Sequence, residues 1–338
     1  MKGNHISVFS RRALIILLPL LLLAVLPAWS QPDARKAKKN QETAQPMPAN
    51  PKLVSEDWDL AGALAGTPSE STEAVEHRNV ELSKDEKTLH TQWAGMRVGI
   101  LGDSMTSRRT LGPTYKVWWE YLSELLGFGA TYNYGISGHQ WHQIYRQAQT
   151  LYAEHAGQVD AILVFAGTND YNAGCPVGEF FRYEDVEVEV KGPKIETRHH
   201  RVPVLDDTTF CGRLNQAMAY MKDRFPDAQI VVMTPIHRGY AKFNEKNVQP
   251  DDFYANGQGL FLEDYVDLIK KAAAYWSIPV VDLYAQSGLV PNLRSNNRYI
   301  NRSANDRLHP ATEGEYRIAK LLQYQLPTFP AGFSFPAE

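Results

Sequence analysis

Five short apolar segments alternate with amphipathic segments from residue 96 onward, and this alternation restricts the fold more than any other feature of the sequence. We expect the apolar segments to be β-strands; they cover residues 97–101, 130–134, 161–165, 229–233 and 279–282. The segments between them carry apolar residues at helical spacing, for example Trp118, Leu122 and Leu125. Apolar strands that alternate with helices are typical of a parallel sheet covered by helices on both faces. We therefore predict a three-layer α/β/α sandwich with a central, mostly parallel five-stranded sheet.

Polar segments follow three of these strands, at the points where the strands end. In a parallel sheet the carboxyl ends of the strands meet at one edge, and ligands bind beyond that edge. Residues 102–104 follow the first strand, residues 133–138 the second, and residues 167–170 the third. A fourth polar segment, residues 306–310, precedes the last helical segment. We expect these four segments to lie close together and to form the functional site.

Ser104 alone is a weak signal for catalysis, because a serine near the start of a helix is often an N-cap. The Gly-x-Ser-x-Gly pattern of α/β-hydrolases is absent, since Thr106 occupies the position of the second glycine. The four polar segments together are a strong signal. In their residues and their order they resemble the SGNH (GDSL-like) hydrolase family of serine esterases, over about residues 96–326.

This resemblance implies that Ser104 is a nucleophile, with His309 as its base and Asp306 as the acid partner of the base. A serine hydroxyl attacks a carbonyl only when a neighbouring base takes its proton, and neutral imidazole suits this task near pH 7. A carboxylate beside the ring holds one tautomer and stabilises the imidazolium that forms. Asp306 and His309 could instead bind a metal ion, but no third ligand follows at suitable spacing. We therefore expect catalysis without a metal ion or another cofactor.

The resemblance also implies an oxyanion hole. The negative charge that develops on the substrate oxygen needs preorganised donors. The family pattern places them at the Gly138 N–H and the Asn169 side chain, beside the N–H of Ser104. Gly135 is an alternative for the glycine. A glycine suits this position because it has no Cβ to keep the substrate away from the backbone.

Two further loops are expected to face the nucleophile. Tyr171 follows the third polar segment, and His237 and Arg238 follow the fourth strand. Such side chains suit a sugar ring, although tyrosine and arginine also fix ordinary loops. His139 and His142, three residues apart, could bind a metal ion, lie on a solvated helix face, or place His139 at the rim of the pocket.

The expected activity is hydrolysis of a small acyl ester, such as acetyl, on a small molecule or an oligosaccharide. Three alternatives remain open: an O-acyltransferase that acts on a glycan, a lipase-like esterase, and an inactive glycan-binding protein. No long apolar lid segment is present, which argues against lipid substrates. The net charge of -3 provides no basic surface for nucleic acid. The oligomeric state is left open.

One excursion interrupts the alternation after the third strand. Residues 183–204 alternate between apolar and polar side chains around a Gly192-Pro193 turn and predict an inserted β-hairpin. We expect it to form part of a rim above the nucleophile. Cys175 and Cys211 flank the hairpin. In an exported protein this pair predicts a disulfide, with two buried free thiols as the alternative.

The N-terminal region has the pattern of an export signal. Lys2, Arg11 and Arg12 precede an apolar run at residues 13–26, which is shorter than the about 20 residues of a membrane-spanning helix. We expect a cleaved signal peptide at residues 1–30 and a secreted or periplasmic protein without a stable membrane span; a retained anchor is the alternative. The domains that follow are a disordered linker (31–50), an N-terminal extension (51–95) and the hydrolase domain (96–330).

Overall fold

The computed structural model describes residue 64 and residues 75–88, 90–108, 110–192 and 194–333. The expected signal peptide and linker lie outside these ranges, as does much of the expected N-terminal extension. No helix in the described ranges is long and apolar enough to cross a membrane.

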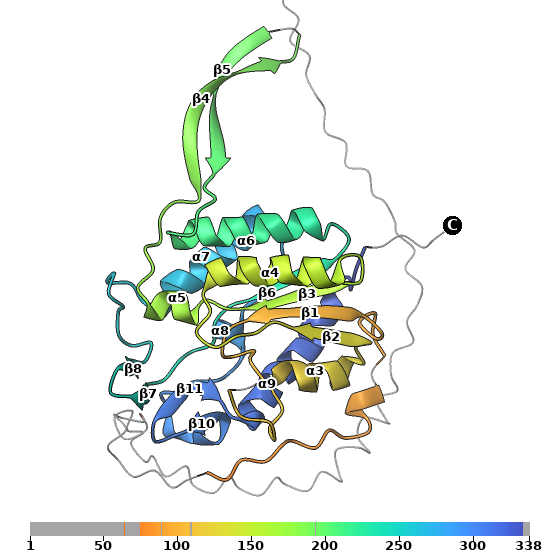
Figure 1. Ribbon diagram of the computed structural model, residues 1–338, viewed down its shortest axis with the longest axis vertical. Helices are drawn as coiled ribbons and strands as arrows, with labels where there is room; N and C mark the ends of the chain where they lie inside the picture. Colours follow the sequence, from red (N-terminus) through yellow and green to blue (C-terminus); the bar gives the residue numbers. More distant parts are fainter. Residues whose placement is uncertain (1–63, 65–74, 89, 109, 193, 334–338) are drawn as a thin grey trace, which may run out of the picture. The chain divides into compact units, whose positions relative to one another are not determined.

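A five-stranded parallel sheet forms the centre of the domain, as predicted (Figure 1). Its strands, in spatial order, are β2 (Ala130–Asn133), β1 (Arg97–Gly102), β3 (Ala161–Phe165), β6 (Gln229–Met233) and β9 (Val280–Val281). Gly102 at the end of β1 pairs with Phe165 at the end of β3, and Ile100 pairs with Asn133 at the end of β2. The polar segments that follow these strands therefore leave the sheet at one edge. The prediction of an α/β fold around this sheet is confirmed.

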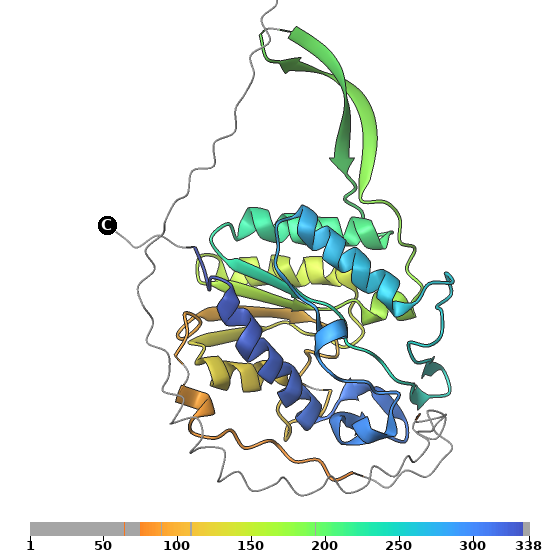
Figure 2. The same ribbon diagram turned by 180° about the vertical axis from the view of Figure 1, so that it is seen from behind.

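Helices cover both faces of the parallel sheet, as Figures 1 and 2 show from opposite sides. One face carries α3 (Trp118–Leu126) and α9 (Thr312–Gln325), and the other carries α4 (Trp141–His155), α6 (Phe210–Arg224) and α7 (Leu262–Tyr275). Each face holds its own apolar cluster, because successive strand residues point to opposite sides: Leu163 joins one cluster, and Val164 the other. The remaining short helices are η1 (Glu86–Thr88), α5 (Thr168–Asn172), α8 (Leu283–Gln286), η2 (Arg294–Tyr299) and η3 (Leu326–Thr328).

The N-terminal residues 75–88 lie against α3 and α9. The backbone N–H of Val80 donates to the Tyr121 hydroxyl at 3.0 Å. His77 lies 3.2 Å from the Glu313 carboxylate on α9. These contacts place the segment on the α3/α9 face of the domain.

A second sheet, which we did not predict, is antiparallel and lies beside the parallel one (Figure 1). Its strands, in spatial order, are β10 (Ile300–Arg302), β11 (Asp306–Pro310), β7 (Ala241–Asn244) and β8 (Asn247–Gln249). Strands as short as β8 and β10 carry too few side chains to show an alternating pattern. β11 is buried along its whole length and therefore does not alternate.

The predicted hairpin is formed by β4 (Phe181–Val190) and β5 (Lys194–Pro203), which pair along their full length. Its base is anchored on α7: the Phe181 ring lies 4.8 Å from the Tyr275 ring, and the Arg201 guanidinium lies 4.4 Å from the Phe181 ring. The expected position above Ser104 is wrong, because no hairpin residue lines the cavity at Ser104. The aromatic anchor instead holds the hairpin beside α6 and α7 (Figure 1).

Cys175 and Cys211 are buried free thiols, so the expected disulfide is absent from the structure. Both side chains belong to the apolar cluster under α4, α6 and α7. Burial raises the pKa of Cys175 to about 11 and that of Cys211 to about 12, which keeps both protonated near neutral pH. The two cysteines flank the hairpin in sequence, but a disulfide also requires matched Cβ directions, which sequence spacing does not specify.

Candidate active site

Ser104 lies directly beyond β1, at the edge where the parallel strands end. The Asp103 carboxylate accepts the N–H of Met105 at 2.9 Å and so fixes the turn around Ser104. Gly102 is needed before this turn, because a Cβ there would lie 2.6 Å from the carbonyl oxygen of Phe165 on β3. Ser104 itself is largely buried, with 8% of its surface exposed. The strand and the turn thus hold this hydroxyl in one place.

His309 on β11 connects Ser104 to Asp306. Its Nε2 lies 2.8 Å from the Ser104 Oγ, and its Nδ1 lies 3.0 Å from both carboxylate oxygens of Asp306. Asp306 also accepts the backbone N–H of His309 at 3.1 Å and the side-chain N–H of Asn301 at 2.8 Å. Burial alone would raise the pKa of Asp306, but the hydrogen bonds from His309 and Asn301 outweigh it and lower this pKa. The carboxylate therefore stays ionised beside the imidazole.

Gly138 and Asn169 line the same cavity of about 410 Å³ as Ser104 and His309. Gly138 has a φ of +82°, a conformation that favours glycine. The Asn169 amide nitrogen donates to the Asp103 carboxylate at 3.2 Å and to the carbonyl of His139 at 3.0 Å. This amide therefore joins the segments that follow β1, β2 and β3. The N–H groups of Ser104 and Gly138 donate to no described residue.

Two buried carboxylates support these segments. Burial raises the pKa of Asp103 to about 7. Burial also raises the pKa of Asp170 to about 6, although Arg213 lies 2.9 Å away and lowers it. Asp170 accepts the N–H of Trp141 at 3.1 Å, at the start of α4. It thereby ties the segment after β3 to the helix that follows Gly138.

Tyr171 and Arg238, which we expected to contact substrate, do not line the cavity at Ser104. Tyr171 is 3% exposed, and its hydroxyl donates to the carbonyl of Tyr254. Arg238 is fully buried and donates to the carbonyl and the hydroxyl of Thr168, both at 3.2 Å. These bonds fix the residue next to Asn169. Arg238 therefore has a positioning role: it holds Thr168, and through it Asn169, without lining the cavity.

His237, the third expected contact, is also outside the cavity. Its Nδ1 lies 2.7 Å from the Asp252 carboxylate, and its ring lies 3.9 Å from the Tyr284 ring. His139 lines a neighbouring cavity, which is described below. Within the part of the chain that the structure describes, no three His, Cys, Asp or Glu side chains are grouped to hold a metal ion.

Thr110, in the segment after β1, lines the cavity and was not predicted from sequence. The second sheet and its loops supply the other cavity residues that we did not predict. They are Phe243, Asn247, Gln249, Asn301, Arg302, Asn305 and Leu308. The Phe243 ring is 42% exposed and lies 5.7 Å from the His309 ring. A signal for some of them is present in the sequence, because residues 296–306 are rich in asparagine and directly precede His309. Nothing local marks Phe243, which lies far from Asp306 in sequence.

Comparisons with known proteins bear on the family and the fold of this chain. The model of the GDSL-like lipase/acylhydrolase family matches residues 100–317. A search of curated proteins found no significant match. One solved crystal structure is 26% identical, with a TM-score of 0.56, and the alignment covers 71% of this chain and 99% of that chain. The crystal structure of a Lactobacillus plantarum protein is 24% identical, with a TM-score of 0.52, over 70% of this chain and 98% of that chain, and supports the fold alone.

The family match covers well over half of the chain and includes all four polar segments, from Ser104 to His309. The resemblance noted in the sequence is thereby confirmed. The chain belongs to the GDSL-like lipase/acylhydrolase family, a family of hydrolases.

Proposed function

We propose that the protein is a serine esterase that removes small acyl groups, such as acetyl, from a carbohydrate. One observation carries the proposal: the Ser104 Oγ lies 2.8 Å from the His309 Nε2, while Asp306 contacts the Nδ1 of the same ring. This is the arrangement in which a base activates a hydroxyl nucleophile.

The cycle that follows from this geometry has two halves. The Ser104 Oγ attacks the ester carbonyl carbon as its proton moves to the His309 Nε2. The tetrahedral intermediate then loses the alcohol, which takes the proton from Nε2, and the acyl group stays on Ser104. Water attacks this acyl-enzyme and gives a proton to Nε2. The carboxylic acid then leaves as Nε2 returns this proton to the Ser104 Oγ, which restores the hydroxyl. Asp306 stays ionised throughout and stabilises the imidazolium.

The N–H groups of Ser104 and Gly138 are available to stabilise the oxyanion, because neither donates to a described residue. Both N–H groups of the Asn169 amide have partners at 3.0 and 3.2 Å. We expect the oxyanion to replace Asp103 as the acceptor of the longer bond.

The cavity walls support a small acyl group and a polar alcohol. Amides are the most frequent side chains in the lining; they belong to Asn169, Asn247, Gln249, Asn301 and Asn305. Phe243 and Leu308 are the large apolar side chains that line this cavity. Two such side chains can contact an acetyl group, whereas a long acyl chain needs a continuous apolar surface. Amides are suited to the hydroxyl oxygens of a sugar.

Replacement of the nucleophile tests the proposal. For Ser104→Ala we expect a folded protein whose kcat on p-nitrophenyl acetate is lower by on the order of 10⁶-fold. Ser123→Ala, on α3, is the matched control and should keep wild-type activity. Circular dichroism and p-nitrophenol release are the measurements. Retained turnover above the level of His309→Ala would remove Ser104 from this role.

Product analysis tests the acyl group and the acceptor. The wild-type enzyme should release free acetate from acetylated sugars and should prefer p-nitrophenyl acetate to the octanoate by kcat/KM. A preference for the octanoate would favour a lipase-like esterase. Transfer of acetyl to an added sugar in place of acetate release would identify an acyltransferase.

We also propose that the enzyme acts outside the cytoplasm. The support is the basic segment at Lys2, Arg11 and Arg12, followed by a short apolar run. N-terminal sequencing of protein recovered from the periplasm or medium tests this, with a mature start near residue 31 as the expected result and an intact N-terminus in the cytoplasm as the contrary one.

A further inference from the structure

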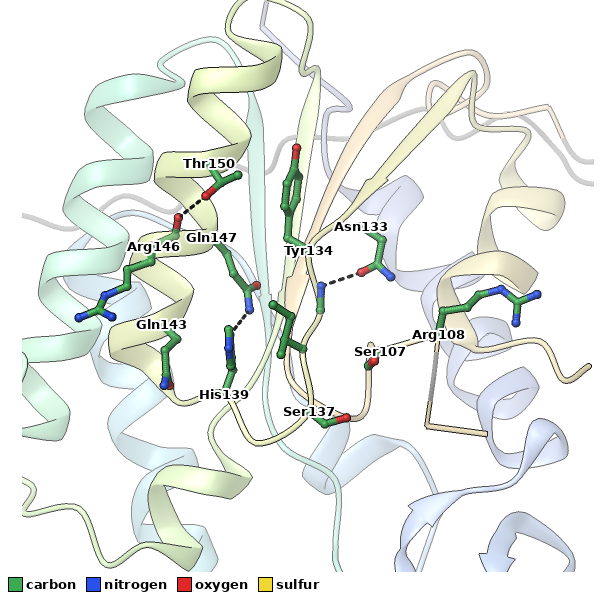
Figure 3. Close-up of a pocket in the computed structure, with 12 residues that line it drawn as sticks. Ser107, Arg108, Asn133, Tyr134, Ser137, His139, Gln143, Arg146, Gln147 and Thr150 are labelled. Carbon is green, nitrogen blue, oxygen red and sulfur yellow. Dashed lines mark hydrogen bonds between the residues drawn. The ribbon is translucent and has the colours of Figure 1, made fainter. Parts of the chain in front are cut away.

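Figure 3 shows the residues that line a second cavity, of about 790 Å³. This cavity is larger than the one at Ser104 and lies next to it. Ser137 lines both cavities, so the turn that carries Gly138 forms their common wall. The volume is in the range of cavities that bind small ligands. A substrate whose ester is at Ser104 can therefore extend past Ser137 into this space.

His139 presents a fixed hydrogen-bond donor in this cavity. The buried Gln147 side chain accepts the N–H of Gly102 at 2.9 Å and donates to the Gly102 carbonyl at 2.8 Å, which sets the orientation of its amide. Its second N–H faces the His139 Nδ1 at 2.8 Å. Nδ1 is therefore the acceptor, and the ring proton is on Nε2. Burial lowers the pKa of His139 and keeps the ring neutral.

Gln143, in the first turn of α4, presents a second donor on the same wall as His139. Its side-chain oxygen accepts the N–H of Gln140 at 2.7 Å, at the start of the helix. This bond leaves the amide nitrogen without an acceptor among the described residues. Figure 3 shows His139 and Gln143 on one side of the cavity, with Tyr134 and Asn133 opposite.

Two charged side chains, Arg108 and Arg146, line this cavity. No aspartate or glutamate lines it. The Arg108 guanidinium forms an ion pair with Glu120 at 2.8 Å and donates to two backbone carbonyls. Figure 3 shows the Arg146 guanidinium directed away from His139 and Tyr134. The cavity therefore suits an uncharged ligand better than an ionic one.

Few large apolar side chains line this cavity. They are Ile136, which is 52% exposed, and Tyr134. Two separate side chains do not form the continuous apolar surface that a fatty acyl chain needs, but they can contact the faces of sugar rings. The neutral donors of His139 and Gln143 match the ring and hydroxyl oxygens of sugars.

We propose that this cavity is a binding subsite for an uncharged oligosaccharide, which holds the sugar units next to the esterified one. This inference rests on the proposed esterase function and specifies its substrate as an acylated neutral oligosaccharide. The enzyme then favours esters on a sugar chain over the same ester on a single sugar.

The test compares acetylated xylose with acetylated xylotetraose. The wild-type enzyme should show a kcat/KM at least tenfold higher on the tetramer. Both His139→Ala and Gln143→Ala should reduce this tetramer-to-monomer ratio by about three- to tenfold, as expected for the loss of one neutral hydrogen bond. Gln149→Ala is the matched control, because Gln149 is an exposed residue of α4 outside the cavity lining, and it should keep the wild-type ratio.

A binding measurement separates this inference from the proposed function. Calorimetry with Ser104→Ala should detect unmodified xylotetraose, and the added Gln143→Ala change should weaken binding by a similar factor. Turnover of acetylated xylose with no preference for the tetramer would overturn the subsite and leave the esterase proposal standing. No turnover of any ester by folded enzyme would overturn the esterase proposal, and the calorimetry would still decide the subsite. Tighter binding of an acidic oligosaccharide, such as tetragalacturonate, would overturn the neutral ligand.

Discussion

Two β-structures lie outside the parallel sheet, and they differ in how they contact the rest of the domain. The hairpin β4–β5 has two ten-residue strands, which pair with each other and are mostly exposed. The sheet β10-β11-β7-β8 has strands of three to five residues. Yet this sheet supplies Asp306 and His309 and much of the cavity wall. Long, regular strands are therefore a poor guide to the functional part of this molecule.

Arg307 explains how such short strands hold a precise site. It is 3% exposed, and its guanidinium donates to the Pro291 carbonyl at 2.9 Å and to the Asn297 side chain at 2.8 Å. One buried arginine between Asp306 and Leu308 therefore ties β11 to the preceding loop. The hairpin has an aromatic anchor at its base, but its outer part has no comparable tie among the described residues.

Of the substitutions that compare the second sheet with the hairpin, we expect the largest loss of activity at Asp306 on β11. Asp306→Asn should lower kcat on p-nitrophenyl acetate by about 10⁴-fold, because the amide can no longer hold His309 in the required tautomer. Asp267→Asn, on the surface of α7, is the matched control. Steady-state kinetics on folded variants measure the effect, and a loss below a hundredfold would show that the second sheet matters less than its position implies.

A smaller effect is expected at Asn301 on β10. Its bond to Asp306 lowers the pKa of that carboxylate, so Asn301→Ala should raise this pKa. The acid limb of the kcat/KM profile should then become steeper, because Asp306 as well as His309 must be unprotonated for activity. We expect activity at neutral pH to fall by about three- to tenfold. Asn305→Ala, which lines the same cavity but makes no described bond to Asp306, should leave the acid limb unchanged. An acid limb as shallow in Asn301→Ala as in the wild type would contradict the role of this bond.

The smallest effect is expected for removal of the hairpin. Arg182 and Val202 pair directly, so an Asn-Gly turn can replace residues 183–201 between them. We expect kcat/KM on p-nitrophenyl acetate to stay within about twofold of wild type. The melting temperature should fall slightly, because the Arg201 contact with Phe181 is lost. A tenfold loss of activity in folded protein would place the hairpin near the substrate after all.

The parallel sheet was predictable from sequence because its strands are apolar on both faces. Residues 161–165 and 229–233, for example, match the observed β3 and β6. The hairpin was predictable because its strands are long enough to show alternation around a Gly-Pro turn. Its position was not, because that depends on the contact between Phe181 and Tyr275, which are far apart in sequence.

The site residues also divide into those that were predictable from sequence and those that were not. Ser104, Asn169, Asp306 and His309 lie in short motifs with recognisable neighbours, and the structure places all four at one cavity. Arg238 lies on a loop after a strand, as cavity residues often do, but it is buried and holds Thr168. Whether a residue of the β6–β7 connection lines the cavity or is buried, as Arg238 is, depends on how that connection packs. For the same reason, Phe243 gave no signal before the structure placed it beside His309.

The long sequence separation within the site has a consequence for folding. Ser104 and His309 are 205 residues apart, and Asn169 bonds to Asp103 across 66 residues. Contacts of this kind are slow to form, because a large part of the chain must be ordered before they do. On the proposed mechanism, an emerging chain without β11 has no base for Ser104 and should be inactive. Recovery of activity after dilution from denaturant therefore reports the completion of the whole domain, whereas circular dichroism reports helices that can form earlier.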